Sequence, residues 1–144
     1  MEVIEETPHL LKKIKLFIVD EDLQYVKNIK DFLEKEFREP LNVKSFPTGE
    51  SALEEIKKID EKPEVVVLDY LGNKQLDTKN EKHTVDDISN ISPDTGIIII
   101  SDKKYENRAM KALAHGAHDF IVKDKFTLKH LLNSIKKVLH PPKC

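Results

Sequence analysis

The sequence predicts an α/β protein built on a parallel β-sheet. Short, continuous apolar runs, of the kind found in strands buried on both faces, alternate with stretches whose apolar residues recur at the helical period. Strands that alternate with helices along a chain are the βαβ pattern of a parallel sheet. The length of 144 residues fits one domain of ordinary size. We therefore expect one α/β domain with a single packed sheet.

Five strands are expected. Four of them are apolar or β-branched runs, so both of their faces should be buried. The segment Leu41–Phe46 alternates apolar and polar residues instead, which places it at an edge of the sheet. The expected strands are Lys15–Asp20, Leu41–Phe46, Val65–Asp69, Gly96–Ser101 and Asp119–Val122.

Helices are expected between and after the strands. Asp22 and Thr48 are candidate N-caps of the first two, and Gly116 is placed to end the helix before the fifth strand. The polar stretch 71–83 has no clear period, and a short helix is expected from near Thr84 to just before Pro93. The longer expected helices are Leu23–Phe37, Thr48–Ile59, Tyr105–His115 and Thr127–Leu139.

The bulk composition excludes several classes of function. With 24 Lys and Arg against 26 Asp and Glu, the chain has no basic footprint for nucleic acid. No apolar run approaches the length of a membrane span. The only cysteine, Cys144, rules out a disulfide within the chain, and the N-terminus lacks the features of a signal peptide. A cytoplasmic location is the default expectation.

Acidic residues follow two of the expected strands. Asp69 ends an apolar run, and Asp20, Glu21 and Asp22 follow another. Ligands bind at the C-terminal ends of strands in a parallel sheet, so these carboxylates would meet if the strands are neighbours. Such a cluster needs a counter-charge, and its oxygen ligands suit Mg²⁺. One carboxylate could then act as a nucleophile toward a phosphoryl group.

A hydroxyl and an ammonium end two further strands. Ser101 ends the fourth expected strand and Lys123 follows the fifth. An aspartyl phosphate needs such groups, because the lysine neutralises phosphoryl oxygens and the hydroxyl donates a hydrogen bond. Plainer interpretations stand beside this one. Asp22 fits an ordinary helix N-cap, and Ser101 alone fits a strand-end hydroxyl.

Together these motifs make the chain resemble the response regulator receiver domains of two-component signalling, the CheY-like family. The resemblance covers residues 15–139, with 1–14 as an N-terminal tail and 140–144 as a C-terminal tail or the start of a linker. It implies a flavodoxin-like fold, a five-stranded parallel sheet of order 2-1-3-4-5 with helices on both faces. The matching motifs are Ile18-Val19-Asp20-Glu21-Asp22, Thr48-Gly49-Glu50-Ser51-Ala52-Leu53, Val65-Val66-Val67-Leu68-Asp69, Ile99-Ile100-Ser101 and Gly116-Ala117-His118-Asp119-Phe120-Ile121-Val122-Lys123.

The resemblance implies a chemical role for each matching residue. Asp69 would be the phosphoacceptor, and Lys123 the lysine that contacts the phosphoryl group. Asp20, Glu21, Asp69 and the backbone carbonyl of Leu71 would hold Mg²⁺, although Asp22 leaves the register of the acidic pair ambiguous by one. A histidine kinase or phosphotransfer protein would be the partner. The chain would catalyse only its own phosphorylation and dephosphorylation, and would not be a metabolic enzyme.

The resemblance also implies a switch. Ser101 would be the switch hydroxyl and Phe120 the aromatic switch residue, although Phe120 also fits the ordinary core. The switch would act on the face made by the Tyr105–His115 helix, the Asp119–Val122 strand and the Thr127–Leu139 helix, which could also form a homodimer. No nucleic acid or membrane binding is expected of this domain itself.

Two departures from the family pattern keep other functions open. The loop 71–75 lacks the usual Met-Pro, and Asp124 replaces the usual proline after the lysine. A cis bond to a non-proline residue costs about 2.5–4 kcal/mol, so the Lys123–Asp124 peptide should be trans. One rival is a pseudo-receiver that binds partners without phosphorylation. A less favoured rival is an Asp-nucleophile phosphatase, which normally has a second Asp where Leu71 stands.

Overall fold

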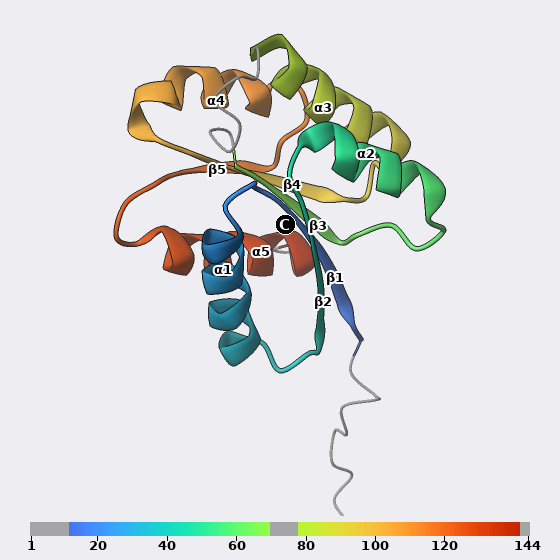
Figure 1. The fold of residues 1–144 in the computed structure, drawn as a ribbon, viewed down its shortest axis with the longest axis vertical. Coiled ribbons are helices and arrows are strands. Elements are labelled where there is room, and N and C mark those ends of the chain that lie inside the picture. The colour runs from blue at the N-terminus through green and yellow to red at the C-terminus, as the bar shows by residue number, and fades with distance from the viewer. Residues whose placement is uncertain (1–11, 70–77, 142–144) are drawn as a thin grey trace, which may run out of the picture.

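A five-stranded parallel sheet, in the order β2-β1-β3-β4-β5, forms the centre of the protein (Figure 1). The structure is a computed structural model that describes residues 12–69 and 78–141. The fold class and strand order expected from the sequence are confirmed. The strands are β1 (Ile14–Val19), β2 (Leu41–Phe46), β3 (Val65–Asp69), β4 (Gly96–Ser101) and β5 (Asp119–Val122).

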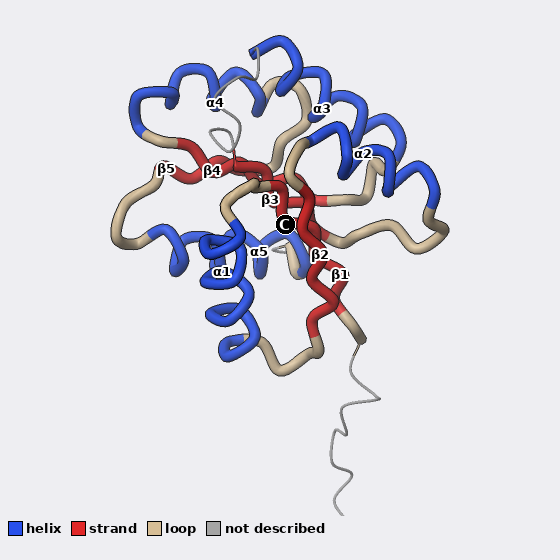
Figure 2. The backbone as a smooth tube through the Cα atoms, viewed as in Figure 1, coloured by secondary structure: helices blue, strands red, loops and turns tan. Residues whose placement is uncertain are grey.

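Helices cover both faces of the sheet. Helices α1 and α5 lie on one face, and α2, α3 and α4 lie on the other, so that the strands form the middle layer (Figures 1 and 2). A 3-10 turn, η2 (Lys103–Tyr105), precedes α4. The helices are α1 (Leu23–Glu36), α2 (Gly49–Lys58), α3 (Thr78–Ile91), α4 (Glu106–Leu113) and α5 (Thr127–Leu139).

The core is divided by the sheet into two clusters, because successive strand residues point to opposite faces. In β4, Ile97 and Ile99 pack toward α2, α3 and α4, whereas Ile98 and Ile100 pack toward α1 and α5. All four side chains are fully buried. Each such side chain stabilises the fold by about 1.5–3 kcal/mol, which explains why the central strands need continuous apolar runs.

The start of α2 packs closely against α3. The Thr48 side chain accepts a hydrogen bond from the Ser51 backbone N–H at 3.1 Å, which completes a capping box. At Gly49, a Cβ atom would lie 2.7 Å from Cγ2 of Thr84. The two helices can pack this closely only because residue 49 has no side chain.

The expected bounds of β2 to β5 and of α5 are confirmed, and the other elements need correction. Helix α1 ends at Glu36, one residue earlier than expected, and α2 is one residue shorter than expected at each end. β1 begins at Ile14 and ends at Val19, one residue earlier than expected. Helix α3 begins at Thr78 rather than near Thr84, because its first turns are polar and carry no apolar period. Helix α4 is shorter than the expected Tyr105–His115 at both ends.

The ends of α4 explain its shortening. Its first expected residue, Tyr105, belongs to the 3-10 turn. At the other end, the N–H groups of Ala114 and His115 bond to carbonyls three residues back, which tightens the chain out of the α-helix. Gly116 follows with φ of 119°, a conformation that favours glycine. Gly116 therefore completes the turn into β5, three residues after the last residue of the helix, Leu113.

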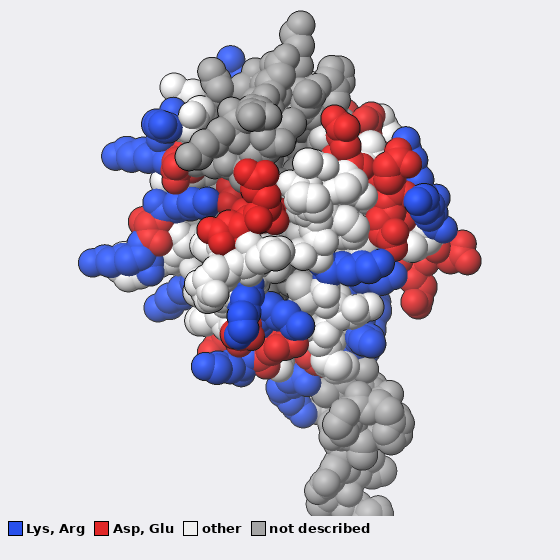
Figure 3. Space-filling view, viewed as in Figure 1, with Lys and Arg blue, Asp and Glu red and all other residues white. Residues whose placement is uncertain are grey.

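Other expectations from the sequence are confirmed. β2 lies at an edge of the sheet, and Asp22 caps α1 by accepting the N–H groups of Gln24 and Tyr25. The Lys123–Asp124 peptide is trans. Within the described part of the chain, no helix has the length and apolar character needed to cross a membrane. Acidic and basic side chains are interspersed on the face shown in Figure 3, with no continuous basic patch.

Candidate functional site

The parallel register brings three predicted site residues to one end of the sheet. Val19 of β1 lies beside Leu68 of β3, so the residues that follow them, Asp20 and Asp69, lie level with each other. Lys123 extends β5 by one hydrogen bond, in which its N–H donates to the Ser101 carbonyl at 2.8 Å. The sequence-based expectation that these side chains meet at the C-terminal ends of the strands is therefore met.

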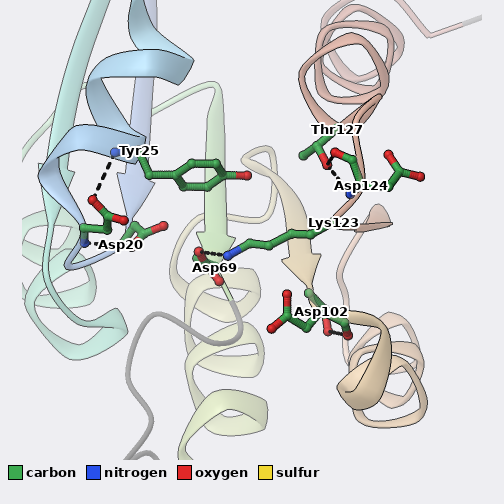
Figure 4. A network of polar contacts seen from close by, with 9 residues as sticks. Asp20, Tyr25, Asp69, Asp102, Lys123, Asp124 and Thr127 are labelled. Carbon is green, nitrogen blue, oxygen red and sulfur yellow. Dashed lines mark hydrogen bonds and ion pairs between the residues drawn. The ribbon is translucent and has the colours of Figure 1, made fainter.

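Asp69 and Lys123 form the central ion pair of the site. The Lys123 Nζ donates to Oδ2 of Asp69 at 2.7 Å, although the two residues come from different strands (Figure 4). The Asp69 side chain is only 4% exposed, whereas that of Lys123 is 28% exposed. A short, charge-assisted hydrogen bond of this kind is stronger than a neutral one. The buried carboxylate is thus neutralised from the solvent-facing side by a partly accessible cation.

Asp20 is a buried carboxyl group with incomplete hydrogen bonding. Its Oδ1 accepts the Asp22 N–H at 2.8 Å, whereas its buried Oδ2 has no hydrogen-bond partner among the described residues. Burial and the neighbouring Asp69 carboxyl raise the pKa of Asp20 to about 7, against the opposing effects of the Asp22 N–H and Lys123. A carboxylate oxygen left without a partner beside a second carboxylate is the environment that a bound cation would complete.

Tyr25 is a site residue that the sequence analysis missed. The Lys123 Nζ lies 4.8 Å from the centre of the Tyr25 ring, and Figure 4 shows the ring extending from the start of α1 across the site. Burial raises the pKa of Tyr25, and the nearby Asp69, Asp20 and Asp102 carboxylates raise it further, so the phenol stays protonated. The only signal in the sequence was an aromatic residue three positions after a helix cap.

Asp102 is a second residue that was not predicted. It follows Ser101 directly, and Figure 4 shows its side chain directed toward the Asp69–Lys123 pair. Its backbone carbonyl accepts the Ser101 hydroxyl at 2.8 Å, so in this structure the fully buried Ser101 donates locally. The signal that could have identified Asp102 was a further acid at a strand end.

The structure does not assign the remaining predicted site residues to this group. Glu21 is exposed, and the described residues contain no group of three or more His, Cys, Asp or Glu placed to hold a metal ion. Phe120 is half-buried and packs against the core cluster on the α2–α4 side of the sheet. Leu71, whose carbonyl was expected to bind Mg²⁺, lies outside the described residues.

The chain is similar to known receiver domains in sequence and in fold. The family model for the response regulator receiver domain matches residues 16–136. A response regulator receiver domain protein from Clostridium thermocellum is 21% identical, with a TM-score of 0.72, and the match covers 88% of this chain and 94% of that one. A response regulator from Thermotoga maritima is 26% identical, with a TM-score of 0.67 and coverage of 89% and 98%.

A third solved structure, the receiver domain of NtrX from Brucella abortus, is 24% identical, with a TM-score of 0.71 and coverage of 88% and 99%. No curated protein sequence matches the chain at a significant level. The family model spans most of the chain, and the solved structures share its fold over nearly their whole length. The chain therefore belongs to the response regulator receiver domain family of two-component signalling.

Proposed function

We propose that Asp69 accepts a phosphoryl group from a histidine of a partner kinase or phosphotransfer protein. The observation that carries this proposal is the buried Asp69 carboxylate, held at 2.7 Å by Lys123 with Asp20 beside it. A structural ion pair alone would not explain why a second buried carboxyl lies next to the first. The receiver family consists of signalling modules rather than metabolic enzymes, and histidine kinases are its general partners.

The proposed transfer forms a bond between an Asp69 oxygen and phosphorus. One oxygen of its carboxylate attacks the phosphorus atom while the bond from phosphorus to the donor histidine nitrogen breaks, and the electron pair leaves with the imidazole. The acyl phosphate so formed adds negative charge where Lys123 already lies. The Lys123 ammonium can then donate its hydrogen bond to a phosphoryl oxygen instead of the Asp69 oxygen. Hydrolysis by water would restore the free carboxylate.

Magnesium is the proposed cofactor, as is typical of receiver domains. The unpartnered Oδ2 of Asp20 and the adjacent Asp69 carboxylate fit a hard divalent cation. Glu21 and the Leu71 carbonyl are proposed as further ligands, either directly or through water. When bound, the metal would neutralise charge on the phosphoryl oxygens. We expect weak binding, because Mg²⁺ dehydrates reluctantly and usually keeps several of its waters at such sites.

The output of the site is proposed to pass through Ser101 and Phe120. Phosphate on Asp69 would offer acceptor oxygens that compete with the Asp102 carbonyl for the Ser101 hydroxyl. Movement of Ser101 would vacate space into which Phe120 could turn, changing the face formed by α4, β5 and α5. The same face is proposed for homodimer formation. Phosphate can shift this equilibrium only by as much as it binds one arrangement better than the other.

Beryllofluoride, a stand-in for the phosphoryl group, tests the proposal. With Mg²⁺ present, it should bind at Asp69 and shift the amide NMR signals of residues at the strand ends. Asp69→Asn should abolish the shifts, and the exposed control Asp94→Asn should retain them. A protein that folds normally but does not respond would instead be a pseudo-receiver. Sustained release of phosphate from small phosphate esters would favour the phosphatase alternative.

A further inference from the structure

The Lys123 ammonium is held between two groups of different kinds. On one side it donates to Asp69 at 2.7 Å, and on another it lies 4.8 Å from the centre of the Tyr25 ring. A distance within about 6 Å of a ring centre gives a favourable cation–π interaction, which is stronger when the pair is partly shielded from water. Tyr25 is half-buried and the Lys123 side chain is 28% exposed, so this contact is partly shielded.

The backbone at Tyr25 is positioned by two acids of the β1–α1 turn, Asp20 and Asp22. Asp20 accepts the Asp22 N–H at 2.8 Å, and Asp22 in turn accepts the Tyr25 N–H at 3.2 Å. These hydrogen bonds fix the first turn of α1 relative to the end of β1. Tyr25 also packs against the core cluster beneath α1 and α5. The backbone that carries Tyr25 is therefore held in place by the β1–α1 turn, and the ring is supported by the core cluster while it lies over Lys123.

We infer that Tyr25 is a positioning residue for the proposed phosphoryl transfer, acting through Lys123. Its ring face keeps the ammonium beside Asp69 when a phosphoryl group replaces the direct ion pair. An ammonium on a flexible four-carbon chain would otherwise move into solvent once its bond to Asp69 is shared. The raised pKa of Tyr25 is consistent with this role, because a neutral ring adds no further negative charge. The inference rests on the proposed function of Asp69.

A purely structural role for Tyr25 is the competing interpretation. A half-buried aromatic residue at the start of a helix commonly fills the core, and its loss would then lower stability without acting on Lys123. The two interpretations differ in what the ring must do. Core packing needs apolar volume, which leucine also supplies, whereas holding an ammonium needs an aromatic face. Tyr25→Leu and Tyr25→Phe therefore separate the two interpretations.

The first measurement uses the protein without metal or phosphate. In the natural chain, the ε-methylene protons of Lys123 should resonate upfield of those of exposed lysines, because they lie over an aromatic face. Tyr25→Phe should keep this upfield position and Tyr25→Leu should lose it. Absence of the upfield position in the natural chain would overturn the inference, whatever the outcome for phosphorylation.

The second measurement follows labelling of Asp69 by acetyl phosphate with Mg²⁺, corrected for the folded fraction of each variant. Tyr25→Leu should slow labelling by about fivefold, and Tyr25→Phe should restore most of the rate. Phe126→Leu is the matched control and should leave the rate unchanged, since Phe126 is 50% exposed and its ring centre lies 5.3 Å from Nζ of Lys125. Equal rates in Tyr25→Leu and the natural chain, or equal losses in both Tyr25 variants, would refute the role of the ring.

The two measurements keep this inference distinct from the proposed function. If the natural chain is never labelled at Asp69, the proposed phosphorylation fails, whereas the Lys123 signals still report whether the ring holds the ammonium. If Asp69 is labelled but the variants do not differ, only the role of Tyr25 fails.

Discussion

Buried polar groups at the two ends of the sheet differ in their hydrogen bonding. At the N-terminal end, Thr95 donates to the Pro63 carbonyl at 2.7 Å and shares a short hydrogen bond with Ser92. Glu64 accepts the Lys15 N–H at 2.7 Å. At the C-terminal end, Asp20 keeps a buried oxygen without a hydrogen-bond partner among the described residues. The side-chain groups named at the N-terminal end thus have hydrogen-bond partners within the described chain, whereas one oxygen of Asp20 at the C-terminal end has none there.

This difference separates stability from function. Buried polar groups that serve only the fold are nearly always hydrogen-bonded, because an unsatisfied group costs free energy. A fold that leaves such a cost uncompensated in one place gains something else there. The incomplete end is where Asp69 and Lys123 also meet, and it is where the proposed phosphoryl group and cation would complete the bonding.

The largest expected effect is that of Asp69→Asn. An amide is a far weaker nucleophile than a carboxylate, so labelling by acetyl phosphate should be abolished. Intact mass measured after incubation with acetyl phosphate and Mg²⁺ checks this, with Asp94→Asn as the control. Full labelling of the mutant would mean that the acceptor lies elsewhere.

Asp20→Asn should stabilise the metal-free protein at neutral pH. The carboxyl has a pKa of about 7 when folded and 3.8 as its ordinary value, so the folded state binds more protons between these values. The free energy of unfolding of the natural chain should therefore fall as pH rises from about 4 to 7. The free energy of unfolding of the mutant should not depend on pH in this way. At pH 8 it should exceed that of the natural chain by roughly 2–4 kcal/mol.

Urea unfolding at several pH values in EDTA measures both effects. Asparagine can still accept the Asp22 N–H, so the local hydrogen bond is not the variable. A mutant that is less stable than the natural chain at pH 8 would show that ionised Asp20 is not strained in the fold.

Thr95→Val, at the N-terminal end of the sheet, should lower stability, whereas Asp20→Asn at the C-terminal end should raise it. Valine has a similar shape, but it leaves the Pro63 carbonyl and the Ser92 hydroxyl short of one partner each. Stability should fall by about 1–3 kcal/mol, with Asp69 labelling unchanged in the folded protein. Urea unfolding and labelling of Asp69, measured on the same preparation, test whether the N-terminal ends of the strands serve stability alone. If Thr95→Val lost labelling of Asp69 but kept its stability, the two ends of the strands would not have separate roles.

Ser101→Ala should affect the response rather than the acceptor. It removes the hydroxyl that now donates to the Asp102 carbonyl at 2.8 Å, and Asp69 should remain open to phosphorylation. Beryllofluoride should shift fewer amide signals along α4, β5 and α5 than it does in the natural chain. An unchanged NMR response in the mutant would remove the hydroxyl from the mechanism.

The smallest effect is expected for Glu21→Gln. Removing this carboxylate should weaken Mg²⁺ binding several-fold, and more than Asp22→Asn does, because Asp22 is used as the cap of α1. Titration of the amide signals with Mg²⁺ gives both affinities. A larger loss for Asp22→Asn would mean that the acidic pair is shifted by one residue from the one proposed.

Much of the fold could be predicted because its signals are local. The bounds of β3 to β5 follow from runs of apolar or β-branched residues, and those of β2 follow from its alternation of apolar and polar residues. The bounds of α5 follow from its apolar period. The sequence left open which acids of the β1–α1 turn face the site. The structure shows Asp20 buried, with its Oδ1 accepting the Asp22 N–H, and Asp22 in the cap of α1.

The missed features depend on contacts between distant parts of the chain. Tyr25 becomes a site residue only because α1 carries it over Lys123, whose position depends on β5. Asp102 matters only because β4 ends beside that pair (Figure 4). The start of α3 was missed for a different reason. Its first residues are polar, so the sequence there shows no apolar residues at the helical period.

The close approach of Gly49 to Thr84 has an evolutionary consequence. A side chain at position 49 would collide with the Thr84 methyl and hydroxyl groups, at 2.7 and 2.9 Å. A mutation to alanine at 49 would thus become tolerable in a lineage where position 84 had first become small. These two positions should covary among descendants of this chain, and Thr84→Ala should act as a second-site suppressor of Gly49→Ala. The junction of α2 and α3 is therefore constrained as a pair, although neither residue takes part in the proposed chemistry.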